Sequence, residues 1–232
     1  MRRHILLLFF TAGCAAVSAQ TPAVPPEYQD IYDSLQTQIA GFDAAVRAKW
    51  DGTPTPMVFA PQLEGANSAL YTSLGLPGYY ESVVLPQLQE LQALGARAIK
   101  VQVSFPILYQ PFYSSNPSQY QTIAGFYQRL AEEIHSRGLQ LIVESTAENQ
   151  FPGANAADFT EYYQTLSWDQ YVAARAQNSL ATARLMQPEY MSVVTEPDSE
   201  AQYTGQTDVA TVAGSVQVVQ AVLNTLRNAG IN

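Results

Sequence analysis

The chain has 232 residues, of which 47% are hydrophobic and 13% are charged, and its formal charge is −9. This length suits one sizeable domain, and the large apolar share with few charges is typical of a globular protein. Lys49 and Lys100 are the only lysines and no stretch is strongly basic, which argues against nucleic acid as a partner.

The N-terminus has the three parts of a secretory signal peptide. Basic residues precede an apolar run at 5–10, and small residues lead to Ala19, after which we expect cleavage. The apolar run is too short to cross a membrane stably. Residues 1–19 therefore predict export to the periplasm or the extracellular space, with no stable membrane span. A lipid anchor on Cys14 is not expected, because Thr11 stands where lipoprotein signals carry an aliphatic residue.

Cleavage removes Cys14, the only cysteine, and His4, so His135 becomes the only histidine. A disulfide is then impossible within the chain. Zinc and copper sites, which favour histidine and cysteine ligands, are not expected. We predict no cofactor. His135 falls in the last turn of a predicted helix, where a cation is favourable, and we interpret it as structural.

Residues 20–26 are rich in proline and predict a linker to a domain at 27–232. Apolar residues recur at spacings of three and four over 27–50, which predicts an amphipathic helix at the start of this domain. These residues are Tyr28, Ile31, Leu35, Ile39, Phe42 and Val46.

Four short apolar runs beyond this helix predict strands, and a helix is expected after each. The strands are expected at 57–60, 98–105, 139–144 and 190–195, and the helices at 79–94, 120–137, 168–186 and 209–228. Gly95 and Gly138 end two of these helices, and Ser167 is expected to cap a third. The alternation predicts an α/β fold of the (β/α)8 TIM-barrel type, with only about the first four βα units present.

Four units are half of an eight-fold barrel of about 250 residues. The sequence ends where a fifth strand is expected to begin. A half-barrel alone would leave two sheet edges exposed. We therefore expect this chain to be the amino-terminal fragment of a longer barrel.

Acidic residues gather where the predicted strands end. Glu64 follows the first strand, Glu144 ends the third and Glu196 ends the fourth. The carboxyl ends of parallel strands share one rim, where barrel active sites form. Pro197 favours an extended backbone at Glu196, so we interpret Glu196 as a catalytic acid presented at that rim. The alternative is a polar loop residue that closes the strand.

The segment Thr195-Glu196-Pro197 resembles the Asn-Glu-Pro motif that ends strand four in the retaining glycoside hydrolases with (β/α)8 barrels, a clan that includes cellulases, mannanases and galactanases. The passages 95–101 and 138–143 fit the same layout. The resemblance implies that Glu196 is the general acid/base in hydrolysis of O-glycosidic bonds of a polysaccharide. It also implies that Thr195 contacts the sugar where the family has Asn. The family's nucleophile, a Glu on strand seven, lies beyond this chain.

Retaining hydrolysis needs two carboxyl groups about 5–5.5 Å apart. Glu144 is the nearest neighbour expected for Glu196, although it could instead bind backbone or a basic side chain. Sugars also stack on aromatic rings, which several predicted loops supply. The candidate substrate-binding residues are Thr195, Glu144, Glu64, Tyr109, Tyr113, Trp168 and Tyr203. Phe112, Tyr162 and Tyr163 lie in the same loops.

Two other functions remain open. One is a non-catalytic carbohydrate-binding or degenerate barrel protein. The other is a metal-dependent barrel enzyme with Glu64, Glu144 and Glu196 around Mg²⁺ or Mn²⁺, which accept carboxylates. The lack of histidine near these strand ends counts against the metal enzyme. The sequence leaves the sugar, the linkage and the oligomeric state open.

Overall fold

A computed structural model describes residues 24–49, 57–148 and 156–231. The chain divides into two compact units, residues 1–56 and 57–232. The predicted signal peptide at 1–19 and most of the predicted linker lie outside the described residues.

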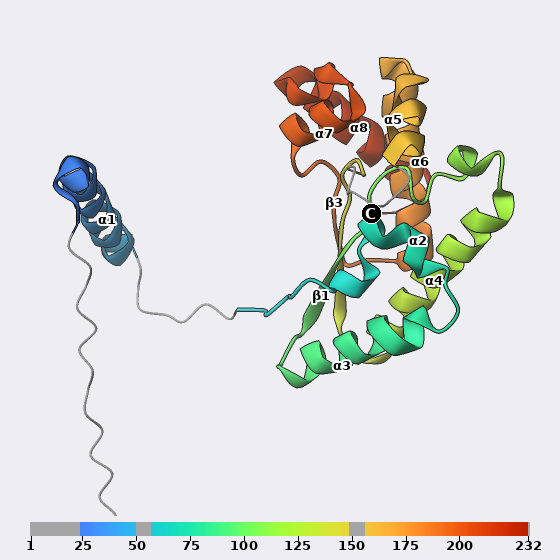
Figure 1. The fold of residues 1–232 in the computed structure, drawn as a ribbon, viewed down its shortest axis with the longest axis horizontal. Helices are drawn as coiled ribbons and strands as arrows, with labels where there is room; N and C mark the ends of the chain where they lie inside the picture. Colours follow the sequence, from blue (N-terminus) through green and yellow to red (C-terminus); the bar gives the residue numbers. More distant parts are fainter. Residues whose placement is uncertain (1–23, 50–56, 149–155, 232) are drawn as a thin grey trace, which may run out of the picture. The chain divides into compact units, whose positions relative to one another are not determined.

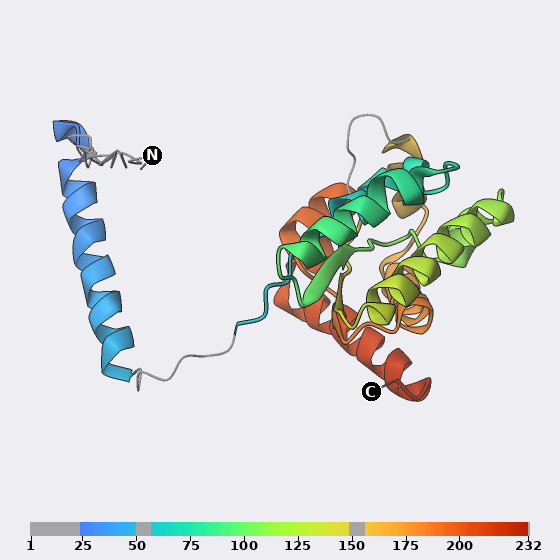
Figure 2. The same cartoon turned by 90° about the horizontal axis from the view of Figure 1, so that it is seen from below.

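The described part of the first unit is helical. The short 3-10 helix η1 (Pro26–Tyr28) leads into α1 (Gln29–Lys49), which is drawn as one continuous blue helix in Figure 2. The helix predicted at 27–50 is therefore confirmed over Gln29–Lys49. None of the residues of α1 is buried.

A small parallel sheet lies at the centre of the second unit (Figure 1). Its strands are β1 (Ala98–Gln102), β2 (Gln140–Glu144) and β3 (Tyr190–Ser192), in the order β1-β2-β3. Both pairings are parallel, as predicted. Side chains alternate between faces, so one face of β1 and β2 is apolar and buried, while the other is half-buried and carries Lys100 and Glu144.

Helices account for most of the second unit. Their bounds are α2 (Tyr71–Leu74), α3 (Leu85–Ala93), α4 (Pro117–Ser136), α5 (Ala156–Gln164), α6 (Trp168–Met186), α7 (Pro197–Thr204) and α8 (Val212–Asn228). The 3-10 helices η2 (Glu64–Ala66), η3 (Ser68–Leu70), η5 (Gln110–Tyr113) and η6 (Thr207–Ala210) and the π-helix η4 (Tyr80–Val84) lie between them. Helix α4 packs against β2 and α6, and α6 packs against α8. Figure 1 shows α4 and α6 on the same side of the sheet.

Helices α4 and α6 follow from their sequences. In α4, Ile123, Leu130 and Ile134 recur at helical spacing and are buried in the core. Burial of each such side chain contributes about 1.5–3 kcal/mol. Helix α6 begins with a capping box, in which Ser167 Oγ accepts the Gln170 backbone N–H and the Gln170 side chain accepts the Ser167 N–H. The predicted cap at Ser167 is therefore confirmed.

The expected barrel with four βα units is wrong. Among the described residues, 66% are helical, and the strands form one three-stranded sheet. Two of the four predicted strands, 98–105 and 139–144, form most of this sheet as β1 and β2.

The predicted first strand, 57–60, does not form a strand, although the carbonyl of Phe59 accepts hydrogen bonds from the N–H groups of Arg97 and Ala98. Met57 is 92% exposed, so no packing holds the start of the run. Further along, a single bridge joins Gln62 to Lys100, and Pro61 accepts a hydrogen bond from the Lys100 N–H. Pro61 has no N–H to return, which prevents a continuous ladder.

The predicted fourth strand, 190–195, is only three residues long in the structure, as β3. Just beyond its end, the carbonyl of Val193 accepts a 2.7 Å hydrogen bond from Arg175 Nη2. Residues 156–164 and 197–204, which were expected to be loops, form α5 and α7. These additions make the unit mainly helical.

Candidate functional site

Glu196 lies between the sheet and α7. It is the residue before the first turn of α7, its side chain is exposed, and it makes no capping hydrogen bond. Thr195 is also exposed, and its hydroxyl lies 3.2 Å from the Ser192 hydroxyl. Glu196 does not line any of the cavities discussed below, which are formed by described residues. The structure therefore presents the Glu196 carboxylate to solvent.

Glu144 forms an ion pair across the half-buried face of the sheet. Its Oε2 lies 2.6 Å from Lys100 Nζ. This is the arrangement expected of a strand-end carboxylate that binds a basic side chain. Glu64 is exposed in η2. Among the described residues, no three acidic, histidine or cysteine side chains gather as metal ligands, so Glu64, Glu144 and Glu196 do not form a common site.

The acid that the structure does enclose is Glu200, one turn beyond Glu196 in α7. Its side chain and that of Arg175 in α6 are fully buried, with 3.0 Å between Glu200 Oε1 and Arg175 Nε. Arg175 Nη2 donates to the second carboxylate oxygen at 3.1 Å. The hydroxyl of Tyr171 also donates to Glu200 through a short hydrogen bond.

The remaining donors of Arg175 connect this pair to the ends of two strands. They bind the carbonyl of Thr146 at 3.2 Å, the hydroxyl of Ser145 at 3.4 Å and the carbonyl of Val193. Burial lowers the pKa of Arg175, but the charge and hydrogen bonds of Glu200, together with the nearby hydroxyls of Tyr171 and Tyr163, outweigh burial and raise this pKa. The pair therefore holds α6, α7 and the strand ends together, as a structural network closed to solvent.

A second buried network surrounds Glu148, which follows β2. Ser68 donates to its Oε2 at 2.6 Å, and the Ser104 N–H donates to the Ser68 hydroxyl at 3.0 Å. The hydroxyl of Tyr163 donates to the carbonyl of Phe105 at 2.8 Å. Burial raises the pKa of Tyr163 well above its ordinary value. These groups hold one another inside the core, which indicates a structural role.

Aromatic rings fill the space beside these networks. Phe105 is central and packs against four tyrosines. Phe112 stacks on Phe159 with 5.5 Å between ring centroids, and meets Tyr162 edge-on at 4.9 Å. The rings come from the segments after β1 and β2, which brings residues about 50 positions apart into one cluster.

One side of this cluster opens as a cavity of about 400 Å³, here called the aromatic cavity. It is lined by Tyr71, Phe112, Tyr113, Ser115, Asn116, Gln119, Glu161, Tyr162 and Thr165. The rings of Phe112 and Tyr162 are half-buried, and Glu161 and Asn116 are exposed at the rim. The site thus combines an apolar ring surface with hydroxyl, amide and carboxyl groups, the usual composition of a small-molecule site.

The aromatic residues proposed from the sequence separate into two places. Tyr113 lines the aromatic cavity, and Tyr109 packs 6.5 Å from the ring of Tyr162. Trp168 instead stacks on Tyr171, and its ring N–H donates to Gln217 at 2.9 Å. Tyr203 is half-buried in α7.

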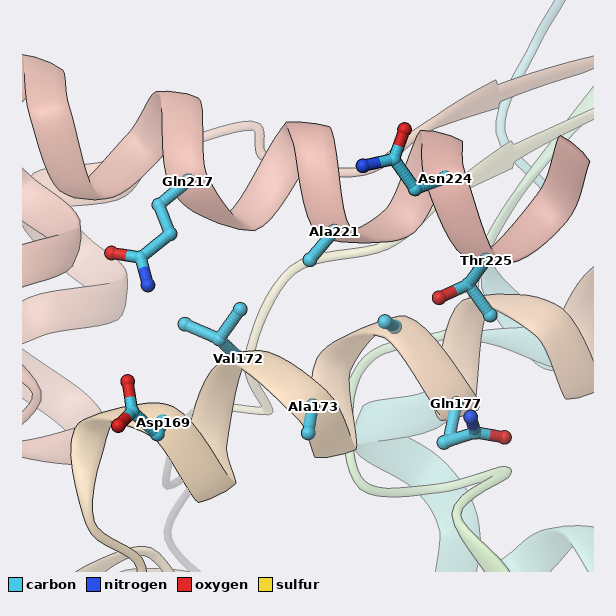
Figure 3. A pocket seen from close by; sticks show the side chains of 9 residues that line it. Asp169, Val172, Ala173, Gln177, Gln217, Ala221, Asn224 and Thr225 are labelled. Atoms are coloured by element: carbon cyan, nitrogen blue, oxygen red, sulfur yellow. The ribbon is translucent and has the colours of Figure 1, made fainter. Parts of the chain in front are cut away.

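A second cavity, of about 440 Å³, lies between α6 and α8 (Figure 3). The cavity is lined by Asp169 and Gln177 of α6 and by Gln217, Asn224 and Thr225 of α8. It offers hydrogen-bonding groups but has no aromatic ring among its lining residues. The aromatic cavity is therefore the better candidate site.

The sequence interpretation missed Arg175 and Glu200. The available signal was a lone arginine in a run of small and apolar residues, at 171–176, and an acid one helical turn after Glu196. No helix among the described residues is long and apolar enough to span a membrane. Comparisons with protein-family models, curated proteins and solved structures found no match for the chain.

Proposed function

We propose that the protein binds a carbohydrate in the aromatic cavity. The observation that carries this proposal is the pairing of half-buried rings, Phe112 and Tyr162, with the polar rim residues Asn116, Gln119 and Glu161. The apolar face of a sugar packs on a ring, while its hydroxyl groups exchange hydrogen bonds with amides and carboxylates around the edge.

The negative charge that Glu161 gives the cavity favours an uncharged ligand over an anionic one. Among the described residues that line the cavity, Glu161 is the only charged one. Without a cation, the site offers no partner for a phosphate or carboxylate. The Glu161 carboxylate can accept hydrogen bonds from sugar hydroxyl groups. These features favour a neutral sugar over an acidic one.

Hydrolysis by Glu196 has weaker support. Glu196 is exposed outside the aromatic cavity, and Glu144 is already paired with Lys100. A retaining mechanism needs a second carboxylate about 5–5.5 Å from the acid. Hydrolysis therefore stays a prediction, which the loss or persistence of activity in Glu196→Gln on a panel of β-linked polysaccharides would test.

The proposed binding is tested by isothermal titration calorimetry with neutral mono- and oligosaccharides. Gln119→Ala removes a rim group, and we expect it to weaken binding about threefold to tenfold, because a hydrogen bond contributes about 0.5–1.5 kcal/mol. Gln121→Ala is the matched control, since Gln121 is exposed on α4 and does not line the cavity.

Three outcomes would count against carbohydrate binding at this place. The first is no measurable binding of any neutral sugar. The second is equal weakening by Gln119→Ala and Gln121→Ala. The third is binding that survives Glu161→Gln and Gln119→Ala together.

We also propose that the protein is exported, on the strength of the sequence pattern at 1–19. N-terminal sequencing of protein recovered from the cell envelope or the medium is expected to begin at Gln20. A mature chain that retains residues 1–19 would contradict this proposal.

A further inference from the structure

Helix α1 carries an exposed apolar stripe. Its aromatic and aliphatic residues are between 39% and 73% exposed. They are Tyr28, just before the helix, and Ile31, Tyr32, Leu35, Ile39, Phe42 and Val46. Single exposed apolar residues are normal on a protein surface, but a continuous stripe marks an interaction site.

The spacing of the stripe is that of a coiled coil. Steps of four and three residues alternate from Tyr28 through Leu35 to Val46, which is the heptad repeat of core positions. The stripe spans three heptads. A partner that fits it is therefore another helix with the same repeat.

The helix also needs a partner for its own stability. Isolated helices in water are marginal, and most helical stability in proteins comes from packing of the apolar face. α1 contains Gly41, which costs about 1 kcal/mol relative to alanine within a helix. No residue of α1 is buried in the described structure. The packing that stabilises α1 therefore has to come from a surface that covers its apolar face.

The charges of α1 are unequal at its two ends. The acidic residues Glu27, Asp30 and Asp33 lie toward its N-terminal end. Arg47 and Lys49 lie in its last turn, where Asp43 neutralises one of these two positive charges by pairing with Arg47. Two such helices attract when they run antiparallel, because each acidic end then faces a basic end, and repel when parallel. The acidic end also disfavours an anionic membrane, which attracts helices rich in lysine and arginine.

We propose that α1 pairs antiparallel with α1 of a second copy of this chain. With a two-fold axis at the level of Thr37, the core positions of the two helices pair in six layers. In each layer both copies contribute an apolar side chain. The layers pair Tyr28 with Val46, Tyr32 with Phe42 and Leu35 with Ile39 of the second copy, each twice. Lys49 lies beyond the last layer, so no charge enters the core of the pair.

The available area is sufficient for a stable contact. Aromatic side chains bury about 150–250 Å² each, and with the observed exposure the stripe presents on the order of 600 Å² per helix. Two copies then bury on the order of 1,200 Å², the lower limit for specific interfaces. The expected dimer is therefore of moderate, concentration-dependent affinity.

The first test is the oligomeric state of the full chain, measured by sedimentation velocity at micromolar concentration. We expect a dimer. Ile39→Asp places a charge in the core of the pair and is expected to give a monomer, with at least a tenfold loss of affinity. Ala40→Asp makes the same charge change one position along, away from the stripe, and is expected to stay dimeric.

The second test is orientation. In a Cys14→Ser background, Gln36→Cys places one thiol on each helix beside the proposed two-fold axis. In the antiparallel pair, the two introduced thiols then lie side by side and form a disulfide under mild oxidation. In a parallel pair, the two thiols lie on opposite sides of the interface. We expect a disulfide-linked dimer from Gln36→Cys and none when Ile39→Asp is added.

A monomeric wild-type chain would overturn the proposal. If Ile39→Asp then also lowered the melting temperature of the monomer, the surface that covers the apolar stripe would be the chain's own 57–232 unit. A dimer that Ile39→Asp leaves intact would overturn it as well. A dimer in which Gln36→Cys fails to cross-link would refute the antiparallel arrangement. None of these outcomes depends on carbohydrate binding.

Discussion

The buried pair of Arg175 and Glu200 gives the sharpest test of how this fold is held together. Glu200→Gln keeps the size of the side chain and removes its charge. The guanidinium of Arg175 then stays fully buried without a compensating carboxylate. Leaving one partner of a buried pair in this state costs about 3–5 kcal/mol.

That cost is large compared with the whole stability of a domain, which is about 5–15 kcal/mol. For a domain of this size, each kcal/mol moves the melting temperature by about 2–4 °C. Glu200→Gln is therefore expected to lower it by about 6–20 °C. The assay is thermal unfolding followed by circular dichroism, and urea unfolding, read as a lower midpoint at an unchanged slope, is the second measurement.

Two further variants show whether the effect comes from the unpaired charge. Glu196→Gln removes an exposed carboxylate one turn earlier and is expected to change stability by less than about 0.5 kcal/mol. Arg175→Met with Glu200→Leu removes both charges and is expected to recover most of the loss, since apolar replacements of buried pairs are often neutral. A Glu200→Gln loss below about 1 kcal/mol, or a double variant no better than the single one, would refute the reasoning.

Three further outcomes are expected. Burial raises the pKa of the core tyrosines above 10.0. Their contribution to the free energy of unfolding is therefore complete below pH 10.0 and falls above it by up to about 1.4 kcal/mol per pH unit for each tyrosine. Alkaline unfolding followed by tyrosine absorbance would show this loss. These tyrosines are Tyr127, Tyr163 and Tyr171. Ser167→Ala removes the cap of α6 and is expected to cost about 1 kcal/mol in thermal unfolding; an unchanged melting temperature would contradict this. Gly138→Ala is expected to cost about 1–2 kcal/mol because its φ is +70°, while Gly125→Ala, within α4 and in open space, is expected to stabilise; equal effects would be inconsistent with this explanation.

Local patterns predicted the longer helices, although they missed α5 and α7. Apolar spacing predicted α1 and α4, and the predicted α6 begins and ends at the observed residues, Trp168 and Met186. The glycine expected to end α4, Gly138, has the positive φ that such a position requires. These features succeed because a helix, its cap and its final turn are set by residues within a few positions of one another.

Local patterns were misleading where a strand needed a neighbour. The run at 57–60 has suitable composition for a strand, yet it stays outside the sheet because Pro61 breaks the ladder and no layer covers Met57. β3 ends after three residues, and the carbonyl of Val193 just beyond it accepts a hydrogen bond from Arg175, which belongs to a helix earlier in the chain. Sheet membership depends on contacts with segments that lie far away in the sequence.

The same distinction holds for the acids. The sequence by itself determined that Glu144 and Glu196 follow apolar runs and that Tyr113 and Tyr162 lie in the segments after the first two sheet strands. Only the tertiary structure decided that Glu196 faces solvent while Glu200, four residues later, is enclosed with Arg175. The physical reason is that burial and charge pairing are set by packing between helices, which the spacing of residues along one segment does not specify.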